Sequence, residues 1–178
     1  STVVQYLTQG GFDGQTLVDE AGGDNNAVRV TGVVPHVASR VSAGQNHSCG
    51  ILLDDTLSCW GANGALESTS PGGTFRDVSV FADHSCGIDM AGQIQCWGNL
   101  SRLGSTAPSG SYLTMDVGDW HGCAVDTSNA LTCWGANGLS DSGQTTPPSG
   151  SNYTEVSVGS RHSCALTADG EARCWGCG

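Results

Sequence analysis

The sequence predicts an all-β repeat protein built from four copies of a short three-stranded unit. The first observation behind this class is repetition: the unit at residues 156–176 recurs at residues 41–61, 78–98 and 115–135. The second is local periodicity, because apolar and polar residues alternate over short runs that Gly- and Asp-containing turns separate. A repeat of about 40 residues is typical of proteins that stack small structural units side by side.

The unit at residues 156–176 shows how the strands are assigned. Val156 and Val158 alternate with polar residues, which predicts a first strand, and residues 159–160 interrupt it. Alternation then resumes on both sides of a second turn at residues 168–170, where Gly170 supplies the positive φ that a tight turn needs. Each unit is therefore expected to contain three strands and two tight turns.

Every unit carries the same fixed residues: a His, a Cys two residues later, a second Cys ten residues after the first, and a Trp-Gly pair. The histidines are His47, His84, His121 and His162. The tryptophans are Trp60, Trp97, Trp134 and Trp175. We expect these tryptophans to be largely buried. We expect each His to be structural, with its ring nitrogens bonded to the backbone of the adjacent turn; a ring of metal-binding imidazoles is the alternative.

The chain has nine cysteines, and eight of them recur at fixed positions in the units. The two in each unit are placed symmetrically about a turn, so a hairpin would bring them within disulfide reach. The predicted pairs are Cys49 with Cys59, Cys86 with Cys96, Cys123 with Cys133, and Cys164 with Cys174. Pairing between neighbouring units is the alternative. Disulfides predict an oxidising location, so the protein is expected to be secreted or on an extracellular surface.

The repeated pattern Val-Ser-x-Gly-x-x-His-Ser-Cys-x-Leu, followed by Asp-Gly and Cys-Trp-Gly, resembles the repeats of the regulator of chromosome condensation superfamily. It is most similar to the cysteine-containing type found in secreted bacterial proteins and in the extracellular part of crinkly-type plant receptor kinases. The resemblance covers residues 41–176 and implies a β-propeller, or part of one, whose blades are these repeats. Two positions depart from the pattern: Phe81 replaces a turn glycine, so that turn must differ, and Gly122 replaces a serine.

The resemblance divides the chain in two. Residues 38–178 are predicted to form four propeller repeats, and residues 1–37 a degenerate first blade or an N-terminal cap. The linkers at residues 62–74, 99–111 and 136–151 are rich in Gly, Pro and Ser, and each is long enough to cross back over a blade and to hold a fourth, irregular edge strand.

The composition excludes several classes of function. The net charge is −11, and all six basic residues are Arg, so the chain has no basic stripe for nucleic acid and no lysine for a Schiff base or a phosphate-binding loop. No apolar run is long enough to span a membrane. Because no nucleophile–base pair, metal cluster or phosphate loop is visible, we expect no enzymatic activity and no cofactor.

The candidate recognition residues lie in the turn between the first and second strands, which varies within an otherwise fixed unit. They are Gln45, Asp83, Trp120 and Arg161, with Trp120 the more exposed tryptophan. Candidate glycosylation sites are Asn99 and Asn152, which lie in expected surface loops, and Asn46, which lies in a tight turn and is expected to be hindered. Cys177 is the ninth cysteine and a candidate for an interchain disulfide. Acidic residues assigned to turns rather than to a calcium or hydrolytic site are Asp54, Asp55, Asp83, Asp116, Asp119, Asp126, Asp141 and Asp169.

Two functions agree with these features. The first is a secreted recognition module that binds a protein or a glycan through its loop face. The second is a structural subunit of an extracellular assembly, in which incomplete propellers pack between chains and form a homo-oligomer. Residues 3–31 closing the ring within one chain would instead give a monomer.

Overall fold

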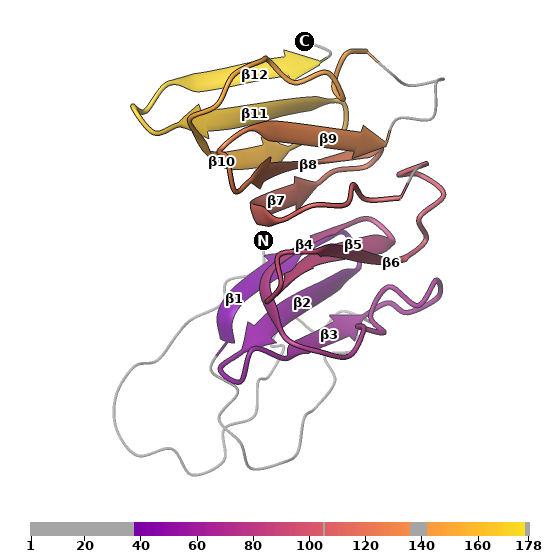
Figure 1. The fold of residues 1–178 in the computed structure, drawn as a ribbon. Helices are drawn as coiled ribbons and strands as arrows, with labels where there is room; N and C mark the ends of the chain where they lie inside the picture. Colours follow the sequence, from indigo (N-terminus) through magenta and orange to yellow (C-terminus); the bar gives the residue numbers. More distant parts are fainter. Residues whose placement is uncertain (1–37, 105, 136–141, 177–178) are drawn as a thin grey trace.

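The computed structural model describes residues 38–104, 106–135 and 142–176, which form twelve strands and no helix. The strands make four three-stranded antiparallel sheets, which we call blades 1 to 4 (Figure 1). Blade 1 contains β1 (Ala38–Ala43), β2 (His47–Leu52) and β3 (Leu57–Gly61). Blade 2 contains β4 (Phe75–Phe81), β5 (His84–Asp89) and β6 (Ile94–Gly98). Blade 3 contains β7 (Tyr112–Val117), β8 (His121–Asp126) and β9 (Leu131–Gly135). Blade 4 contains β10 (Tyr153–Val158), β11 (His162–Thr167) and β12 (Ala172–Gly176). The predicted all-β class and three strands per unit are confirmed.

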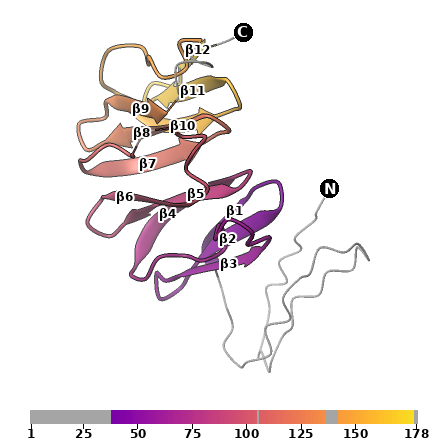
Figure 2. The ribbon, with the colours of Figure 1, turned by 90° about the vertical axis from the view of Figure 1, so that its right-hand side faces the viewer.

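The blades follow one another in sequence order, and the second strand of each is central in its sheet. Figures 1 and 2 show them as a stack with blade 1 at one end and blade 4 at the other. Each blade contacts the next mainly through its first and second strands. The described residues therefore form consecutive propeller blades whose first and last members do not meet.

Each first strand begins three residues earlier than the sequence pattern predicts. A register shift explains the difference: in blade 2 the pairing with β5 is irregular between Phe75 and Asp77, and the other three blades repeat this bulge. A bulge changes which residues share a face of the sheet. The alternation of apolar and polar residues that begins at Val78 therefore does not extend back to the true start of the strand at Phe75. The predicted difference at Phe81 is confirmed, because β4 extends to Phe81 and Ala82 adopts a φ of 44°.

The second turn of each unit requires a left-handed residue at one position. Asp55, Gly92, Asn129 and Gly170 occupy it, with φ values of 64°, 88°, 62° and 87°. These residue types tolerate that conformation best, which explains why only Gly, Asn and Asp are found there. Asp54 and Asp126 stabilise their turns by accepting hydrogen bonds from backbone N–H groups, as expected.

The hydrophobic core lies between the blades, in three similar clusters. In the first, Cys49 and Ile51 of β2 pack against Phe75, Val78 and Val80 of β4, with Trp97 beside them. The second and third clusters join blades 2 and 3 and blades 3 and 4 in the same way. Blades 1 to 3 therefore each bury their second strand against the first strand of the blade that follows.

The histidines of blades 1 and 3 form hydrogen bonds across the same interfaces, whereas His162 of blade 4 is exposed. His47 Nε2 lies 2.7 Å from Ser85 Oγ of blade 2, and His121 Nε2 lies 2.7 Å from Ser163 Oγ of blade 4. Their structural role is as expected, but the predicted partner was wrong, because these rings bond to the next blade rather than to their own turn.

The histidine of blade 2 bonds differently because of a glycine. Gly122 stands where the other blades have serine, and a Cβ there would lie 2.4 Å from Trp134 Cζ2. With no hydroxyl available, His84 Nε2 donates to the carbonyl oxygen of Gly118 at 3.0 Å. The departure from the repeat pattern at Gly122 thus makes room for Trp134 and redirects one interblade hydrogen bond.

A second polar link recurs along the first strands. Ser42 accepts a hydrogen bond from the backbone N–H of Val80 at 3.0 Å, and Ser79 accepts one from Val117 at 3.1 Å. Asp116 does the same for Val158 at 2.6 Å. Asp116 therefore lies in β7 and joins two blades, so its assignment to a turn was wrong.

All four predicted disulfides are present. They are Cys49–Cys59, Cys86–Cys96, Cys123–Cys133 and Cys164–Cys174, each with Cα atoms 4.0 Å apart. The paired cysteines lie directly opposite each other in the second and third strands. Each bridge therefore closes one hairpin within a blade, and pairing between blades is excluded for these eight cysteines.

The predicted burial of the tryptophans is confirmed for Trp97 and Trp134 but wrong for Trp60, which is 38% exposed. Trp120 is half-buried, so the expectation that it is the more exposed tryptophan is wrong with respect to Trp60. Trp97 Nε1 donates to the carbonyl oxygen of Glu67 in the linker that precedes blade 2, at 2.9 Å. The half-buried Trp175 bonds Gln144 of its preceding linker at 2.8 Å. The linkers before blades 2 and 4 thus each bond the tryptophan of the blade that follows, whereas Trp134 Nε1 of blade 3 has no hydrogen-bond partner in the part of the chain that the structure describes. Residues 1–37, which precede blade 1, lie outside the described residues.

The described linker residues form turns rather than the fourth strand that the sequence allowed. The described linker residues take part in two isolated β-bridges, Thr56 with Thr74 and Ala130 with Ser151. The predictions for residues 1–37, Asp141 and Cys177 fall outside the described residues.

Candidate recognition surface

The turns between first and second strands lie at one end of the blades, together with the first residues of the linkers. We call this surface the loop face; it comprises residues 44–46, 82–83, 118–120, 159–161 and 99–102. Antiparallel pairing places the second turn of every unit at the opposite end. All four predicted recognition residues are therefore on the loop face, one in each blade.

A cluster around Arg102 brings two of these predicted residues together. Arg102 Nη1 bonds the carboxylate of Asp119, and its Nε lies 3.9 Å from Asp83 Oδ1. The guanidinium carbon lies 5.3 Å from the centre of the Trp120 ring. Asn99 Nδ2 donates to Asp83 Oδ2 at 2.8 Å. We call these five residues the Arg102 cluster; it joins the turns of blades 2 and 3 through one linker.

The cluster is partly exposed, and Arg102 at its centre contacts three of its other members. The side chain of Arg102 is 40% exposed, while two carboxylates and one aromatic ring fix its orientation. Guanidinium groups pair with carboxylates and stack on indole rings in defined geometries, so these contacts reduce its freedom. Two acidic groups and one basic group leave the cluster with an acidic balance.

A buried histidine lies next to the cluster. His84 Nδ1 lies 3.7 Å from Asp83 Oδ1, and the His84 ring is fully buried. Burial lowers the pKa of His84, an effect that its bond to Gly118 and the nearby Asp83 partly offset. The ring is therefore neutral near pH 7. Its one N–H, at Nε2, donates to Gly118 of blade 3, so Nδ1 has no proton to donate to Asp83, and the ring links the start of β5 to blade 3.

The sequence did not identify Arg102 because it lies in a linker for which the sequence predicts a crossing segment or an edge strand, and no recognition residue. Its signal was present, since it is one of six basic residues in a strongly acidic chain. Asp119 was interpreted as a turn former, and its pairing with Arg102 joins residues 17 positions apart.

The other two predicted recognition residues lie away from this cluster. Gln45 is exposed in the turn of blade 1, and Arg161 is exposed in the turn of blade 4. Because blades 1 and 4 are at the two ends of the stack, the structure does not bring all four residues into one site.

The three candidate glycosylation residues differ in accessibility. Asn46 and Asn152 are exposed, and Asn152 adopts a φ of 107°. The Asn99 amide nitrogen, which would carry a glycan, is bonded to Asp83. The structure therefore reverses the expected order of Asn46 and Asn99, and it leaves Asn46 and Asn152 as the accessible acceptors. Glycosylation itself stays a prediction.

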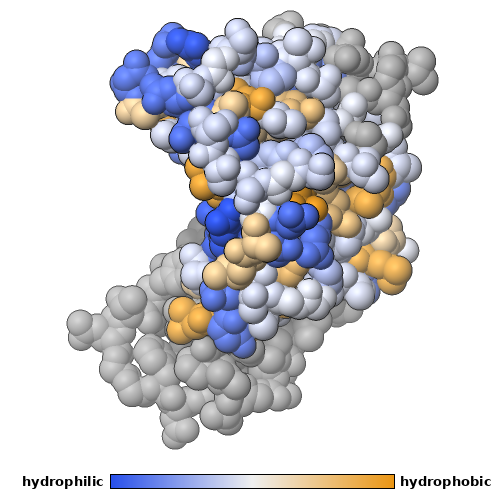
Figure 3. Space-filling model, viewed as in Figure 1, coloured by the Kyte–Doolittle hydropathy of each residue, from blue (hydrophilic) through white to orange (hydrophobic). Residues whose placement is uncertain are grey.

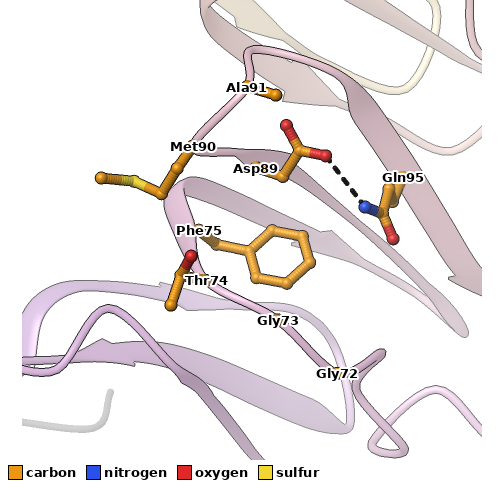
Figure 4. Close-up of a pocket in the computed structure, with 8 residues that line it drawn as sticks. All are labelled: Gly72, Gly73, Thr74, Phe75, Asp89, Met90, Ala91 and Gln95. Atoms are coloured by element: carbon orange, nitrogen blue, oxygen red, sulfur yellow. Dashed lines mark hydrogen bonds between the residues drawn. The ribbon is translucent and has the colours of Figure 1, made fainter.

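An open hollow lies at the end of blade 2 opposite the loop face (Figure 4). It is lined by Gly72, Gly73, Thr74, Phe75, Asp89, Met90, Ala91 and Gln95. Gln95 Nε2 donates to Asp89 Oδ2 at 3.0 Å, so the main polar side chains of the hollow are already hydrogen-bonded to each other. On the side of the molecule in Figure 3, hydrophobic residues form small separate patches.

Among residues 38–104, 106–135 and 142–176, no group of three or more His, Cys, Asp or Glu side chains is placed to hold a metal ion. Within the same part of the chain, no helix is long and apolar enough to cross a membrane.

Four consecutive blades with a disulfide in each define a β-propeller repeat protein. Residues 38–65 and 153–178 match the family model of the Regulator of chromosome condensation (RCC1) repeat. The chain therefore carries RCC1-like β-propeller repeats. No curated protein sequence matches the chain.

Solved structures share the fold at low sequence identity. The CRINKLY WD40 ectodomain from the Arabidopsis thaliana receptor kinase ACR4 is 21% identical, with a TM-score of 0.64 over 78% of this chain and 50% of its own. The ectodomain of the Physcomitrella patens receptor kinase CR4 is 21% identical, with a TM-score of 0.67 over 80% of this chain and 42% of its own. Prp20p from Saccharomyces cerevisiae is 18% identical, with a TM-score of 0.63 over 79% of this chain and 44% of its own. The chain thus spans half or less of each of these structures.

Proposed function

We propose that this chain is a secreted, non-enzymatic recognition module that binds a partner protein through its loop face. The Arg102 cluster carries the proposal. Arg and Trp are the residue types that most often dominate the binding energy of protein interfaces. Here they are stacked on each other and held in place before any partner arrives, which lowers the entropic cost of binding.

The stacking favours a protein over a glycan as the partner. A sugar binds tryptophan through the flat face of the ring, and the Arg102 guanidinium occupies one face of Trp120. A protein partner uses the exposed edge of the guanidinium and the two carboxylates as well. One structural neighbour also binds proteins, because Prp20p has binding properties toward Gsp1p and histones.

Two further observations support the secreted and non-enzymatic parts of the proposal. Four disulfides are stable in an oxidising compartment, and the two receptor-kinase neighbours are ectodomains. The His47–Ser85 pair has the spacing of a base and a nucleophile, but both side chains are buried between blades. A substrate has no access to that pair, so we assign it to structure.

The test selects peptides from a random display library on the full chain and measures their binding to the variants Arg102→Ala and Trp120→Ala. We expect about tenfold weaker binding to each, equivalent to about 1.4 kcal/mol. The control Met90→Ala changes an exposed residue at the opposite end of blade 2 and should bind normally. Peptides that bind all three variants equally would contradict the loop-face site. Ligands found only on a glycan array would contradict a protein partner.

A structural subunit of an extracellular assembly is the second candidate function. One observation favours it: Leu166 in blade 4 is 37% exposed, although Ile51, Ile88 and Val125 are fully buried at the same position in blades 1 to 3. A core position left open at the end of a stack is an expected site of association.

A further inference from the structure

The contacts between blades use two different surfaces, and each blade carries both. Toward the following blade, it presents its His and Cys, the apolar residue four positions after the His, and alternate residues of its first strand. Toward the preceding blade, it presents the other first-strand residues, the residue after its His, and its Trp. We call these the forward surface and the backward surface. Among the described blades, the forward surface of one blade contacts the backward surface of the next at three interfaces.

The forward surface of blade 4 has every one of these groups, and all of them except the half-buried Cys164 are exposed. His162 is exposed, whereas the other three histidines are buried. Leu166 is exposed next to it, and so are Glu155 and Ser157 of β10. Ser157 stands at the position where Ser42 accepts a backbone hydrogen bond from the next blade.

The backward surface of blade 1 is open in the same way. Val41 is 46% exposed, although the equivalent Val78 is buried. Trp60 and Ala43 are also exposed, and Ser48 is only half-buried. Blade 1 therefore presents an open backward surface at one end of the stack, and blade 4 presents an open forward surface at the other.

We propose that the forward surface of blade 4 binds the backward surface of blade 1 in a second copy of this chain. This inference rests on the second proposed function, the assembly subunit, and is independent of the Arg102 cluster. The internal contacts supply the geometry. His162 Nε2 pairs with Ser48 Oγ of the second copy, as His47 pairs with Ser85. Ser157 accepts a hydrogen bond from the Ala43 N–H of the second copy.

Charge complementarity favours this partner. In the first internal interface Arg40 Nε bonds the buried Asp77 at 2.9 Å, and its side chain is still half exposed. The residue equivalent to Arg40 and Asp77 in blade 4 is Glu155. In the proposed contact Glu155 therefore faces Arg40, whose guanidinium has donors for a second carboxylate.

The contact joins two different surfaces, so it is head to tail. Two copies that make it twice close a ring to which each contributes its four described blades, and eight blades is within the range of known propellers. If the blade rotation does not close the ring with two copies, the same contact continues into a longer oligomer. Docking of residues 1–37 onto the open surfaces of their own chain is the competing arrangement.

The test uses light scattering on the full chain and two variants that each block one surface. Leu166→Asp places a charge on the forward surface, and Val41→Asp places one on the backward surface. We expect the wild type to be dimeric or larger and each variant to be monomeric. An equimolar mixture of the two variants should form a dimer, because one intact contact remains between them. Leu113→Asp, an exposed leucine in blade 3, is the control and should associate like the wild type.

The outcomes separate the inference from the function on which it rests. A wild type that stays monomeric at high concentration overturns both, and the recognition module is unaffected. Variants that still associate, or a mixture of variants that stays monomeric, overturn the head-to-tail contact while leaving assembly through another surface. Far-UV circular dichroism checks that both variants keep the folded β signal.

Discussion

His47 Nε2 in blade 1 and Ser85 Oγ in blade 2 lie 2.7 Å apart, and both side chains are buried. A hydrogen bond between neutral groups contributes about 0.5–1.5 kcal/mol, and a partner left unpaired in the core costs about 1–3 kcal/mol. This relationship ties two blades together through residues 38 positions apart.

We expect a double-mutant cycle of His47→Ala and Ser85→Ala to show coupling of about 0.5–1.5 kcal/mol in the free energy of unfolding. Urea denaturation of the four proteins measures it. The control pairs His47→Ala with Ser163→Ala, which lies two interfaces away, and those effects should add. Additive effects of His47→Ala and Ser85→Ala would mean that the hydrogen bond does not link the blades.

The tryptophans should differ in their contribution to stability. Trp97→Ala removes a buried ring that bonds Glu67, so it should cost about 3–5 kcal/mol. Trp120→Ala removes a partly exposed stack with Arg102 and should cost about 0.5–1 kcal/mol. Chemical denaturation gives both values. Equal losses would remove Trp120 as a recognition residue, because its ring would then belong to the core.

Each disulfide should make its own contribution to the free energy of unfolding. The Cys86–Cys96 bridge closes a loop of ten residues, for which chain entropy gives about 2–3 kcal/mol. A Cys86→Ala/Cys96→Ala variant should therefore unfold at lower urea by that amount. Peptide mapping without reductant should recover all four predicted pairs. Recovery of these cysteines as free, alkylatable thiols would argue against both the bridges and a secreted location.

Mild acid should destabilise the fold through its buried histidines. Burial lowers the pKa of His47 and His84 below the ordinary value of 6.5. Below about pH 6.5 the unfolded chain therefore binds more protons than the folded chain, and the free energy of unfolding falls. Burial raises the pKa of Asp77 and Asp116, so these carboxyls act in the opposite direction as the pH falls through their raised pKa values.

Comparison with His84→Gln separates the two effects, because the glutamine amide still donates to Gly118 but does not titrate. We expect the melting temperature of the variant to fall less than that of the wild type between about pH 7.5 and about pH 5.5. Calorimetry at both pH values measures the difference. Parallel decreases in the two proteins would show that His84 does not cause the acid sensitivity.

The sequence was sufficient for the features that depend on nearby residues. Cys49 and Cys59 face each other across one hairpin, and Gly170 occupies the turn that needs positive φ. Both follow from strand alternation and turn chemistry within about ten residues. The start of β4 at Phe75 was missed because the bulge changes the alternation.

The contacts between blades were not predictable from local pattern. His47 bonds a serine in another repeat, and Asp116, interpreted as a turn residue, joins β7 to β10. Arg102 was missed in the candidate site for the same reason, since its partners Asp83 and Asp119 lie in turns of two blades. The sequence shows which residues recur in each unit, but the packing of the blades determines which of them contact each other.

Native-state hydrogen exchange of backbone amides tests most directly the claim that one repeated interface holds the blades and remains open at blade 4. Amides of β5 and β8, which neighbouring blades flank, should exchange slowly at every protein concentration. Amides of β11 should exchange faster in dilute solution and become protected as the concentration rises and a second copy covers them. Amides of β11 that are as protected as those of β5 in dilute solution, with no dependence on concentration, would contradict the claim.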